Sequence, residues 1–357
     1  MELNDFPIAK TRADNSQRFN LNDPAERARY FENKAGEEIK AIKKYLNEGK
    51  TFVAFLLGKK NSGKGTYSKL FMEAIGSDKI GHVSIGDIVR DAHTLVETEA
   101  GQNQLIEFLK KNYRGFHSPE ETIDLILGRS QSSLISSELI IALIKYEISR
   151  RPKQAIFIDG FPRALDQVSY SLYLKEIIGY RDDPDFLVFI SLPNTVIHER
   201  IKYRVICPLC KTPRSLKLMI TKEIGYDEST NQFYLKCDNS TCQGTRLIPK
   251  QGDELGIEPI RERLETDDKI IQQLLKLHGI PKVYLRNVIP TAEAEANVDD
   301  YEITPAYEYE RTADGTIQVK ELPWIVKDDQ GVDSYSLLPP PIVVSLIKQI
   351  AKVLELV

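Results

Sequence analysis

The stretch GKKNSGKGT, from Gly58 to Thr66, constrains this chain more than any other feature of its sequence. It fits G-x-x-x-x-G-K, a glycine-rich loop whose backbone N–H groups surround phosphate groups. The residues before it, TFVAFLL (51–57), are apolar, as in a buried parallel strand, and residues 66–75 have apolar side chains at helical spacing. Because a helix start after such a loop attracts anions, the sequence predicts a phosphate site with Lys64 as its cation.

Further short apolar segments predict more strands of the same kind. QAIFIDGF (154–161) and DFLVFISLP (185–193) each follow a helical pattern, and KVYLRNV (282–288) is a possible last strand. A long helix is expected over 257–278. Strands that alternate with helices indicate an α/β fold with a parallel central sheet.

The two ends of the chain differ from this pattern. Residues 1–48 are polar and contain one helical run, which we interpret as an appended helix. Residues 291–310 hold seven acidic and no basic side chains, which predicts an exposed loop or excursion from the fold. The chain closes with PPPIVVSLIKQIAKVLELV, where proline stands at the start of a predicted helix.

The charge and hydropathy of the chain exclude two classes of partner. A net charge of −4 provides no basic field for non-specific binding of nucleic acid. No stretch approaches the ~18 to 20 apolar residues of a membrane span, and the N-terminal residues are charged rather than apolar. We therefore expect a cytoplasmic protein that binds neither nucleic acid nor membrane.

All four cysteines fall in one short region, as two close pairs. Two pairs of soft thiolate ligands suit a tetrahedral Zn²⁺ ion, and a closed shell of four thiolates is structural because it leaves no position for water. Unbound thiols, an iron–sulfur centre and a zinc ribbon that binds nucleic acid are the alternatives. The predicted ligands are Cys207, Cys210, Cys237 and Cys242.

Five segments together resemble the adenylate kinase family of nucleoside monophosphate kinases. They are GKKNSGKGT, HVSIGDIVR (82–90), FIDGFPRALDQ (157–167), ERIKYRVICPLC (199–210) and IRERL (260–264), and they occur in the family's order. The resemblance covers about residues 50–290. It implies a three-layer α/β/α P-loop fold with an inserted monophosphate-binding domain and a zinc-stapled lid.

The resemblance also implies a division of the chain. The N-terminal helical extension covers 1–48, and the C-terminal extension, with the acidic loop and the terminal helix, covers 291–357. Between them we expect a core (49–83, 145–202 and 251–290), a monophosphate-binding domain with an insertion (84–144) and a lid (203–250). The expected oligomeric state is a monomer.

Carried over residue by residue, the resemblance implies phosphoryl transfer from ATP to AMP, with Mg²⁺ bound to ATP. Residues implied in the transfer itself are Lys64, Asp159, Arg163, Arg204 and Arg263. The ATP site would comprise Gly58, Asn61, Ser62, Gly63, Lys64, Gly65, Thr66 and Arg200, with Arg200 against the adenine and Asp159 near Mg²⁺. The AMP site would comprise Ile85, Arg90, Ile135, Gly160, Arg163 and Gln167, with Gln167 on the Watson–Crick edge of the base.

The chain departs from the family pattern in several places. Asn61 replaces a residue that is usually glycine, although asparagine tolerates left-handed backbone angles, and we expect the loop to keep its shape. Ile85 replaces a usual threonine, and about twenty extra residues lie between Arg90 and Leu134. The usual Arg-x-Asp-Asp run of the lid is missing, so Arg246 or Lys250 is a candidate replacement.

These departures keep other functions open. CMP, UMP or GMP could replace AMP as the acceptor, since Ile85 weakens the case for AMP while Gln167 supports it. A catalytically weak nucleotide-binding regulatory protein is the alternative from another class, suggested by the irregular lid and Asn61.

Overall fold

A computed structural model describes residues 5–13, 17–128, 135–250 and 252–357. Leu134, where the predicted match after the insertion begins, and residue 251, the predicted start of the last core segment, lie outside these ranges. Parts of the N-terminal extension, residues 1–4 and 14–16, also lie outside them.

A parallel sheet of five strands forms the centre of the molecule, with strand order β10-β4-β1-β3-β2. Its strands are β1 (Val53–Gly58), β2 (Ile80–Ser84), β3 (Ala155–Asp159), β4 (Asp185–Ser191) and β10 (Lys282–Arg286). The register pairs Leu56 of β1 with Asp159 of β3, so the phosphate loop and Asp159 leave the same edge of the sheet. This arrangement confirms the α/β class, and β2 is a strand that the sequence analysis did not identify.

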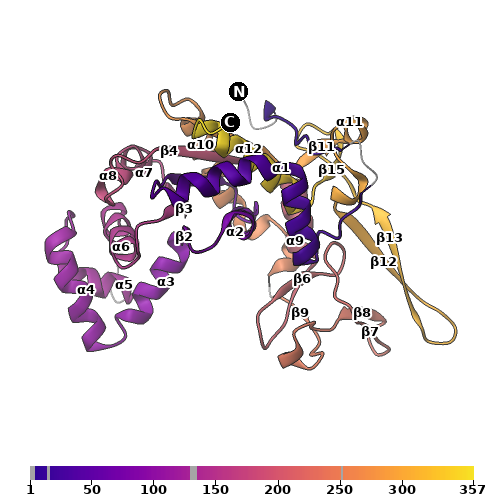
Figure 1. Ribbon diagram of the computed structural model, residues 1–357. Helices are drawn as coiled ribbons and strands as arrows, with labels where there is room; N and C mark the ends of the chain where they lie inside the picture. Colours follow the sequence, from indigo (N-terminus) through magenta and orange to yellow (C-terminus); the bar gives the residue numbers. More distant parts are fainter. Residues whose placement is uncertain (1–4, 14–16, 129–134, 251) are drawn as a thin grey trace.

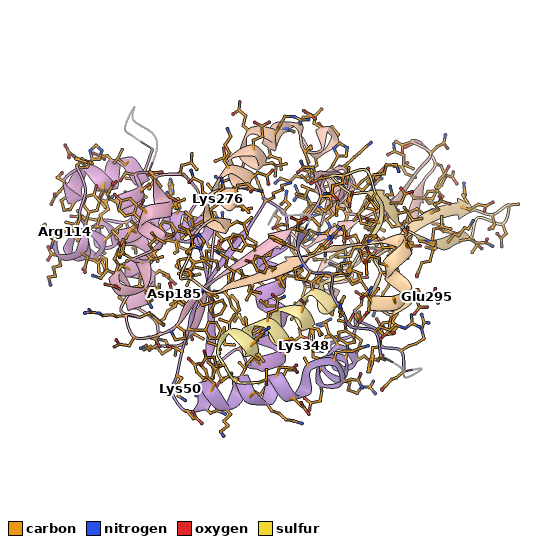
Figure 2. The ribbon with its side chains drawn as sticks, turned by 90° about the horizontal axis from the view of Figure 1, so that it is seen from above. Lys50, Arg114, Asp185, Lys276, Glu295 and Lys348 are labelled. Carbon is orange, nitrogen blue, oxygen red and sulfur yellow. The ribbon has the colours of Figure 1, made fainter. Side chains whose placement is uncertain are left out.

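Helices cover both faces of this sheet, because alternate residues of each strand enter different cores. Ala54 and Leu56 pack with α1 (Pro24–Asn47), α2 (Lys64–Ile75) and α12 (Pro339–Val353). Val53 and Phe55 pack on the opposite face, with α6 (Ser137–Ser149) and α10 (Arg261–Leu275). In Figure 2, α12, marked by Lys348, lies beside α1. The three-layer architecture is therefore as predicted, and both terminal helices belong to one of its layers.

A group of short helices extends from one end of the sheet (Figure 1). It comprises α3 (Ile85–Leu95), α4 (Glu99–Asn112) and α5 (Pro119–Ile126), and it leads into α6. Each helix starts at a side-chain cap, since Ser84, Thr98, Ser118 and Ser136 accept hydrogen bonds from backbone N–H groups of the first turn. The additional residues in this part of the sequence thus include helical structure.

Small antiparallel sheets occupy the other end of the molecule (Figure 1). The predicted lid holds a three-stranded sheet, β6-β5-β9, and a hairpin, β7-β8. Their bounds are β5 (Arg204–Ile206), β6 (Pro213–Ser215), β7 (Ile224–Asp227), β8 (Gln232–Leu235) and β9 (Ile248–Pro249). The helices α7 (Gln167–Ser171) and α8 (Leu174–Ile177) lie between β3 and β4, and α9 (Asn194–Lys202) connects β4 to β5 of this region.

The segment between β10 and α12 is folded, so the prediction of an exposed acidic loop at 291–310 was wrong. This segment forms β11 (Val288–Pro290), α11 (Thr291–Asn297), β12 (Pro305–Arg311), β13 (Ile317–Pro323), β14 (Ile325–Lys327) and β15 (Asp333–Ser336). Glu302 is fully buried, and it accepts hydrogen bonds from the hydroxyl groups of Thr11 and Tyr30, which replace the water that it loses. Hydroxyl groups far away in the sequence therefore supply hydrogen bonds to this one buried acid.

The boundaries of other helices and strands differ by a few residues from those expected from the sequence. The helix expected over 257–278 begins as a 3-10 turn at Glu258–Ile260 and continues as α10 to Leu275. The expected strand at 282–288 divides at Asn287 into β10 and β11, which join different sheets. Across the described ranges, none of the helices has the length and apolar character to cross a membrane.

Candidate functional site

The loop from Gly58 to Thr66 connects β1 to α2 in a tight turn. Asn61 has a φ of 67° and Gly63 a φ of 97°, so both adopt left-handed angles, as the sequence analysis expected asparagine to tolerate at position 61. A Cβ at Gly58 would lie 2.6 Å from Ser62 Oγ, which excludes any larger residue there without movement. Because α2 begins at Lys64, its positive end faces the loop.

Lys64 reaches back over this loop toward the end of β3. Its Nζ donates hydrogen bonds to the carbonyl oxygens of Gly58 (2.8 Å) and Lys59 (3.0 Å) and lies 3.9 Å from Asp159 Oδ1. Burial lowers the pKa of Lys64, while the negative charges of Asp159 and Asp267 oppose that shift. A cation that is partly withdrawn from water and held by weak acceptors is able to bind an incoming phosphate strongly.

A pocket of about 450 Å³ opens above the loop. That volume lies within the range of small-ligand sites. Its lining combines the loop with residues of β3, α2, α9 and the start of the lid: Asn61, Ser62, Gly63, Lys64, Gly65, Thr66, Lys69, Asp159, Arg200, Ile201 and Arg204. All predicted ATP-site residues except Gly58 thus line one cavity, and Gly58 lies behind it at the end of β1.

The two arginines of α9 and β5 have different partners in this pocket. Arg204 forms a two-pronged ion pair with Asp253, with N–O distances of 2.6 and 2.7 Å. The Arg200 guanidinium donates to Asn287 Oδ1 (3.2 Å) and Ser336 Oγ (3.3 Å), and burial lowers the pKa of Arg200. Two N–H groups of Arg200 are therefore directed at the segment after β10, and its predicted contact with adenine stays a prediction.

The predicted monophosphate residues gather mainly around the end of β3. The backbone N–H of Arg163 donates to Gln167 Oε1 at 2.7 Å, and Gln167 Nε2 donates to Ser137 Oγ at 3.1 Å. A Cβ at Gly160 would lie 3.7 Å from both Ile85 Cβ and Arg163 Cδ, so these three positions are neighbours. Their proposed contacts with AMP stay predictions.

Two other residues of that predicted set lie at its edge. Arg90 pairs with Asp87 on the exposed surface of α3, with 71% of its side chain accessible. Ile135 is half-buried and packs against the core on the α6 side of the sheet. The structure therefore brings Ile85, Gly160, Arg163 and Gln167 together and directs Arg90 toward a surface acid.

Arg263, on α10, links the two halves of the site. Its Nη1 donates to the carbonyl oxygen of Arg163 at 3.2 Å, and its Nη2 lies 2.8 Å from Asp267 Oδ1. The positive charge of Arg263 contributes, after burial, to lowering the pKa of Arg163. Lys64, Asp159, Arg163 and Arg263 thus form one charged group, next to the pocket that Arg204 also lines.

The four cysteines come together in the lid, with all four Sγ atoms within 4.8 Å of one another. Cys207, Cys237 and Cys242 are buried in a small apolar cluster with Val205, Leu235 and Leu247. Thiolate ligands at ~2.3 Å around one zinc ion would have comparable sulfur separations. This donor set fits a single tetrahedral metal ion.

Arg246, one of the two candidates to replace the missing lid arginine, already has interaction partners within the lid. Its guanidinium pairs with Asp227 at 2.7 Å and lies over the ring of Tyr234. Lys250 is exposed.

Sequence reasoning missed several side chains that support the site. Lys59 is buried between Asn194, Asp268 and Asp329, and Lys69 lines the pocket. The Asp267–Asp268 pair, one helical turn after Arg263, was a sequence signal that could have indicated an acidic partner for the basic loop.

Comparison with known proteins gives a consistent set of relatives. No family model matches the chain. It is 28% identical over 244 residues to a protein named adenylate kinase from Petrotoga mobilis, covering 68% of this chain and 90% of the relative. Adenylate kinases from Clostridium acetobutylicum (26%, 68% and 92%) and Bacillus subtilis (28%, 65% and 88%) match similarly.

Proposed function

Because this chain is related to the adenylate kinase family, we propose that it transfers the terminal phosphoryl group of ATP reversibly to AMP, giving two molecules of ADP. The relatives support a nucleoside monophosphate kinase. That the acceptor is AMP is the more specific part of our proposal. One observation supports it most: Lys64, Asp159 and Arg204 line one pocket, and Arg163 and Arg263 lie beside it.

In this proposal the loop binds the phosphates of ATP. Backbone N–H groups from Asn61 to Thr66 and the positive end of α2 would hold the β and γ phosphates, with Lys64 Nζ exchanging its two carbonyl acceptors for phosphate oxygens. Asp159 and Thr66 supply oxygen atoms of the kind that Mg²⁺ prefers. When bound, Mg²⁺ would neutralise phosphate charge.

The transfer itself needs no covalent intermediate on the protein. An oxygen of the AMP phosphate attacks the γ-phosphorus, the bond from that phosphorus to the β-phosphate oxygen breaks, and ADP forms on both sides. Arg204 lines the pocket and Arg263 donates to the carbonyl oxygen of Arg163 beside it, so the three side chains would stabilise the negative charge that passes between the two nucleotides. Their planar guanidinium groups match phosphate oxygens in geometry.

We further propose that the region from 84 to 144 binds the monophosphate and that 203–250 is a lid stabilised by zinc. The four cysteines would hold the metal as a structural staple, since a shell of four thiolates leaves no position for substrate. Closure of both regions would exclude water, which protects ATP from hydrolysis. The remaining ranges, 49–83, 145–202 and 251–290, would form the core that binds both nucleotides.

A rate measurement with AMP, CMP, UMP and GMP as acceptors tests this function. We expect the ratio of kcat to KM to be highest for AMP, because an amide can both donate to and accept from the base. Gln167 would exchange its present partners, the Arg163 N–H and Ser137 Oγ, for the base. A Gln167→Leu variant should then lose preference among the four acceptors. Transfer to another monophosphate but not to AMP would replace our choice of substrate, and no transfer to any of them would refute the function.

A further inference from the structure

Asp267 is a buried carboxylate that the proposed reaction does not itself use. It lies on α10, one helical turn after Arg263, and only 7% of the residue is exposed. A carboxylate placed there loses most of its hydration, and burial accordingly raises the pKa of Asp267. Such a group is stable only where hydrogen bonds and cations replace the water.

Both oxygens of Asp267 have a partner, and the two partners belong to different parts of the site. Oδ2 accepts a hydrogen bond from the backbone N–H of Lys60, within the phosphate loop, at 2.9 Å. Oδ1 forms an ion pair with Arg263 Nη2 at 2.8 Å. One carboxylate therefore joins α10 to the phosphate loop.

The same contacts fix the orientation of the Arg263 guanidinium. Asp267 holds its Nη2, and the carbonyl oxygen of Arg163 accepts from Nη1 at 3.2 Å. These contacts use two of the five N–H donors of an arginine, which leaves donors for phosphoryl oxygens. The guanidinium is thus held from two sides, against the loop on one side and the end of β3 on the other.

The charges around Asp267 are consistent with its holding Arg263 in place. The positive charges of Arg263, Lys64 and Arg163 all favour the ionised form of Asp267. Conversely, the charge of Asp267 opposes the effect of burial on the pKa of Lys64. Without this carboxylate, Asp159 would remain, but less negative charge would offset the mutual repulsion of the three cations before any phosphate arrived.

We propose that Asp267 is a positioning residue that sets the distance and orientation of Arg263 relative to the phosphate loop. This inference rests on the proposed function, because it assigns Arg263 to the phosphoryl group that is transferred. Asp267 contacts no substrate in this account. It acts on the transfer through Arg263, and its bond from the Lys60 N–H holds it against the phosphate loop. Phosphoryl transfer depends on positioning, so a small displacement of Arg263 changes kcat more than ATP binding.

The test compares Asp267→Asn with the wild-type protein in steady-state kinetics. Asparagine keeps the shape of the side chain, but its single carbonyl oxygen can serve only one of the two donors. We expect kcat to fall about 10- to 100-fold, with the KM for ATP changing less than about threefold because the loop and Lys64 remain. Glu265→Gln, the same change at an exposed position of α10, is the matched control and should retain wild-type kinetics.

A double-mutant cycle with Arg263→Gln separates positioning from a general loss of structure. If Asp267 acts through Arg263, adding Asp267→Asn to Arg263→Gln should lower kcat by less than about twofold. Independent, multiplying effects would overturn the proposal, as would an Asp267→Asn variant with wild-type kcat. Should that variant be unfolded by circular dichroism, Asp267→Ser, which is uncharged and smaller than aspartate, replaces it under the same criteria.

Hydrogen exchange tests the role of Asp267 in anchoring the loop independently of the proposed function. If the wild-type protein transfers no phosphoryl group to any of the four monophosphates, the function fails and Arg263 has no such role to be positioned for. The Asp267→Ala variant then tests whether Asp267 anchors the loop. In this variant the amide hydrogen of Lys60 should exchange at least about tenfold faster than in the wild-type protein. Unchanged exchange at Lys60 would overturn that part as well.

Discussion

Replacing Lys59 by methionine is expected to destabilise the folded protein at neutral pH. Lys59 Nζ lies 2.9 Å from Asn194 Oδ1, 3.4 Å from Asp268 Oδ2 and 3.6 Å from Asp329 Oδ2. It therefore connects the phosphate loop to α9, α10 and the segment before α12. Methionine keeps the length of the apolar stem but removes the charge, so two carboxylates lose their shared cation.

The size of the effect follows from how exposed the partners are. Breaking a fully buried ion pair costs about 3–5 kcal/mol, whereas exposed pairs contribute about 0–1 kcal/mol. Here the lysine side chain is only 5% exposed, but the side chains of Asp268 and Asp329 are 36% and 32% exposed. Solvent screens part of the interaction, and we expect a loss of about 1–3 kcal/mol in the free energy of unfolding.

The loss should depend on pH in a definite direction. Burial raises the pKa of Asp268, and Lys59 opposes that shift, so removing Lys59 raises the pKa further. A carboxyl group with a raised folded-state pKa favours the folded state most below its unfolded pKa, and this contribution is lost as pH rises through the folded pKa. The destabilisation caused by Lys59→Met should therefore be largest near neutral pH and shrink toward about pH 4.

Urea unfolding at several pH values measures this effect. Lys60→Met is the matched control, because the neighbouring side chain is exposed, and it should change the free energy of unfolding by less than about 0.5 kcal/mol. Equal stability of Lys59→Met and wild type at neutral pH would refute the reasoning. So would a destabilisation that increases on acidification.

Three further changes have expected outcomes of their own. Removing metal with a chelator should speed hydrogen exchange around the four cysteines, and purified protein should contain about one zinc per chain; unaltered exchange would contradict the zinc staple. Tyr309→Phe deletes a hydrogen bond from the β12–β13 hairpin to the carbonyl oxygen of Leu216. Exchange of the lid segment at Leu216 should then rise, with a loss of global stability of about 1 kcal/mol or less. Glu302→Ala leaves the hydroxyl of Tyr30 without its buried acceptor, and urea unfolding should show a loss of about 2–4 kcal/mol.

Much of the core could be predicted from short-range patterns in the sequence. The apolar runs at β1, β3 and β4 are buried on both faces of the sheet, so they stand out as continuous hydrophobic segments. β2 has the sequence IGHVS, with a glycine and a half-exposed histidine, and lacks that signal. The position of Asp159 beside the loop follows directly once the two strands are parallel neighbours.

The rest depended on contacts between distant segments, which composition does not reveal. The acidic charges after β10 predicted an exposed loop, but Lys34 of α1 pairs with Asp299 at 2.7 Å and Glu302 accepts from Thr11 and Tyr30. The sequence analysis likewise did not single out Asp267. Only the fold shows that it faces the backbone of the phosphate loop.

Direct observation of ADP tests the central claim most plainly. Wild-type protein mixed with ATP, AMP and Mg²⁺ should produce the phosphorus NMR signals of ADP, with both nucleotides consumed in equal amounts. Lys64→Ala should lower this rate by at least about 100-fold, while Lys79→Ala, at an exposed position outside the pocket, should not. Inorganic phosphate in place of ADP, no turnover at all, or full activity in Lys64→Ala would contradict the account.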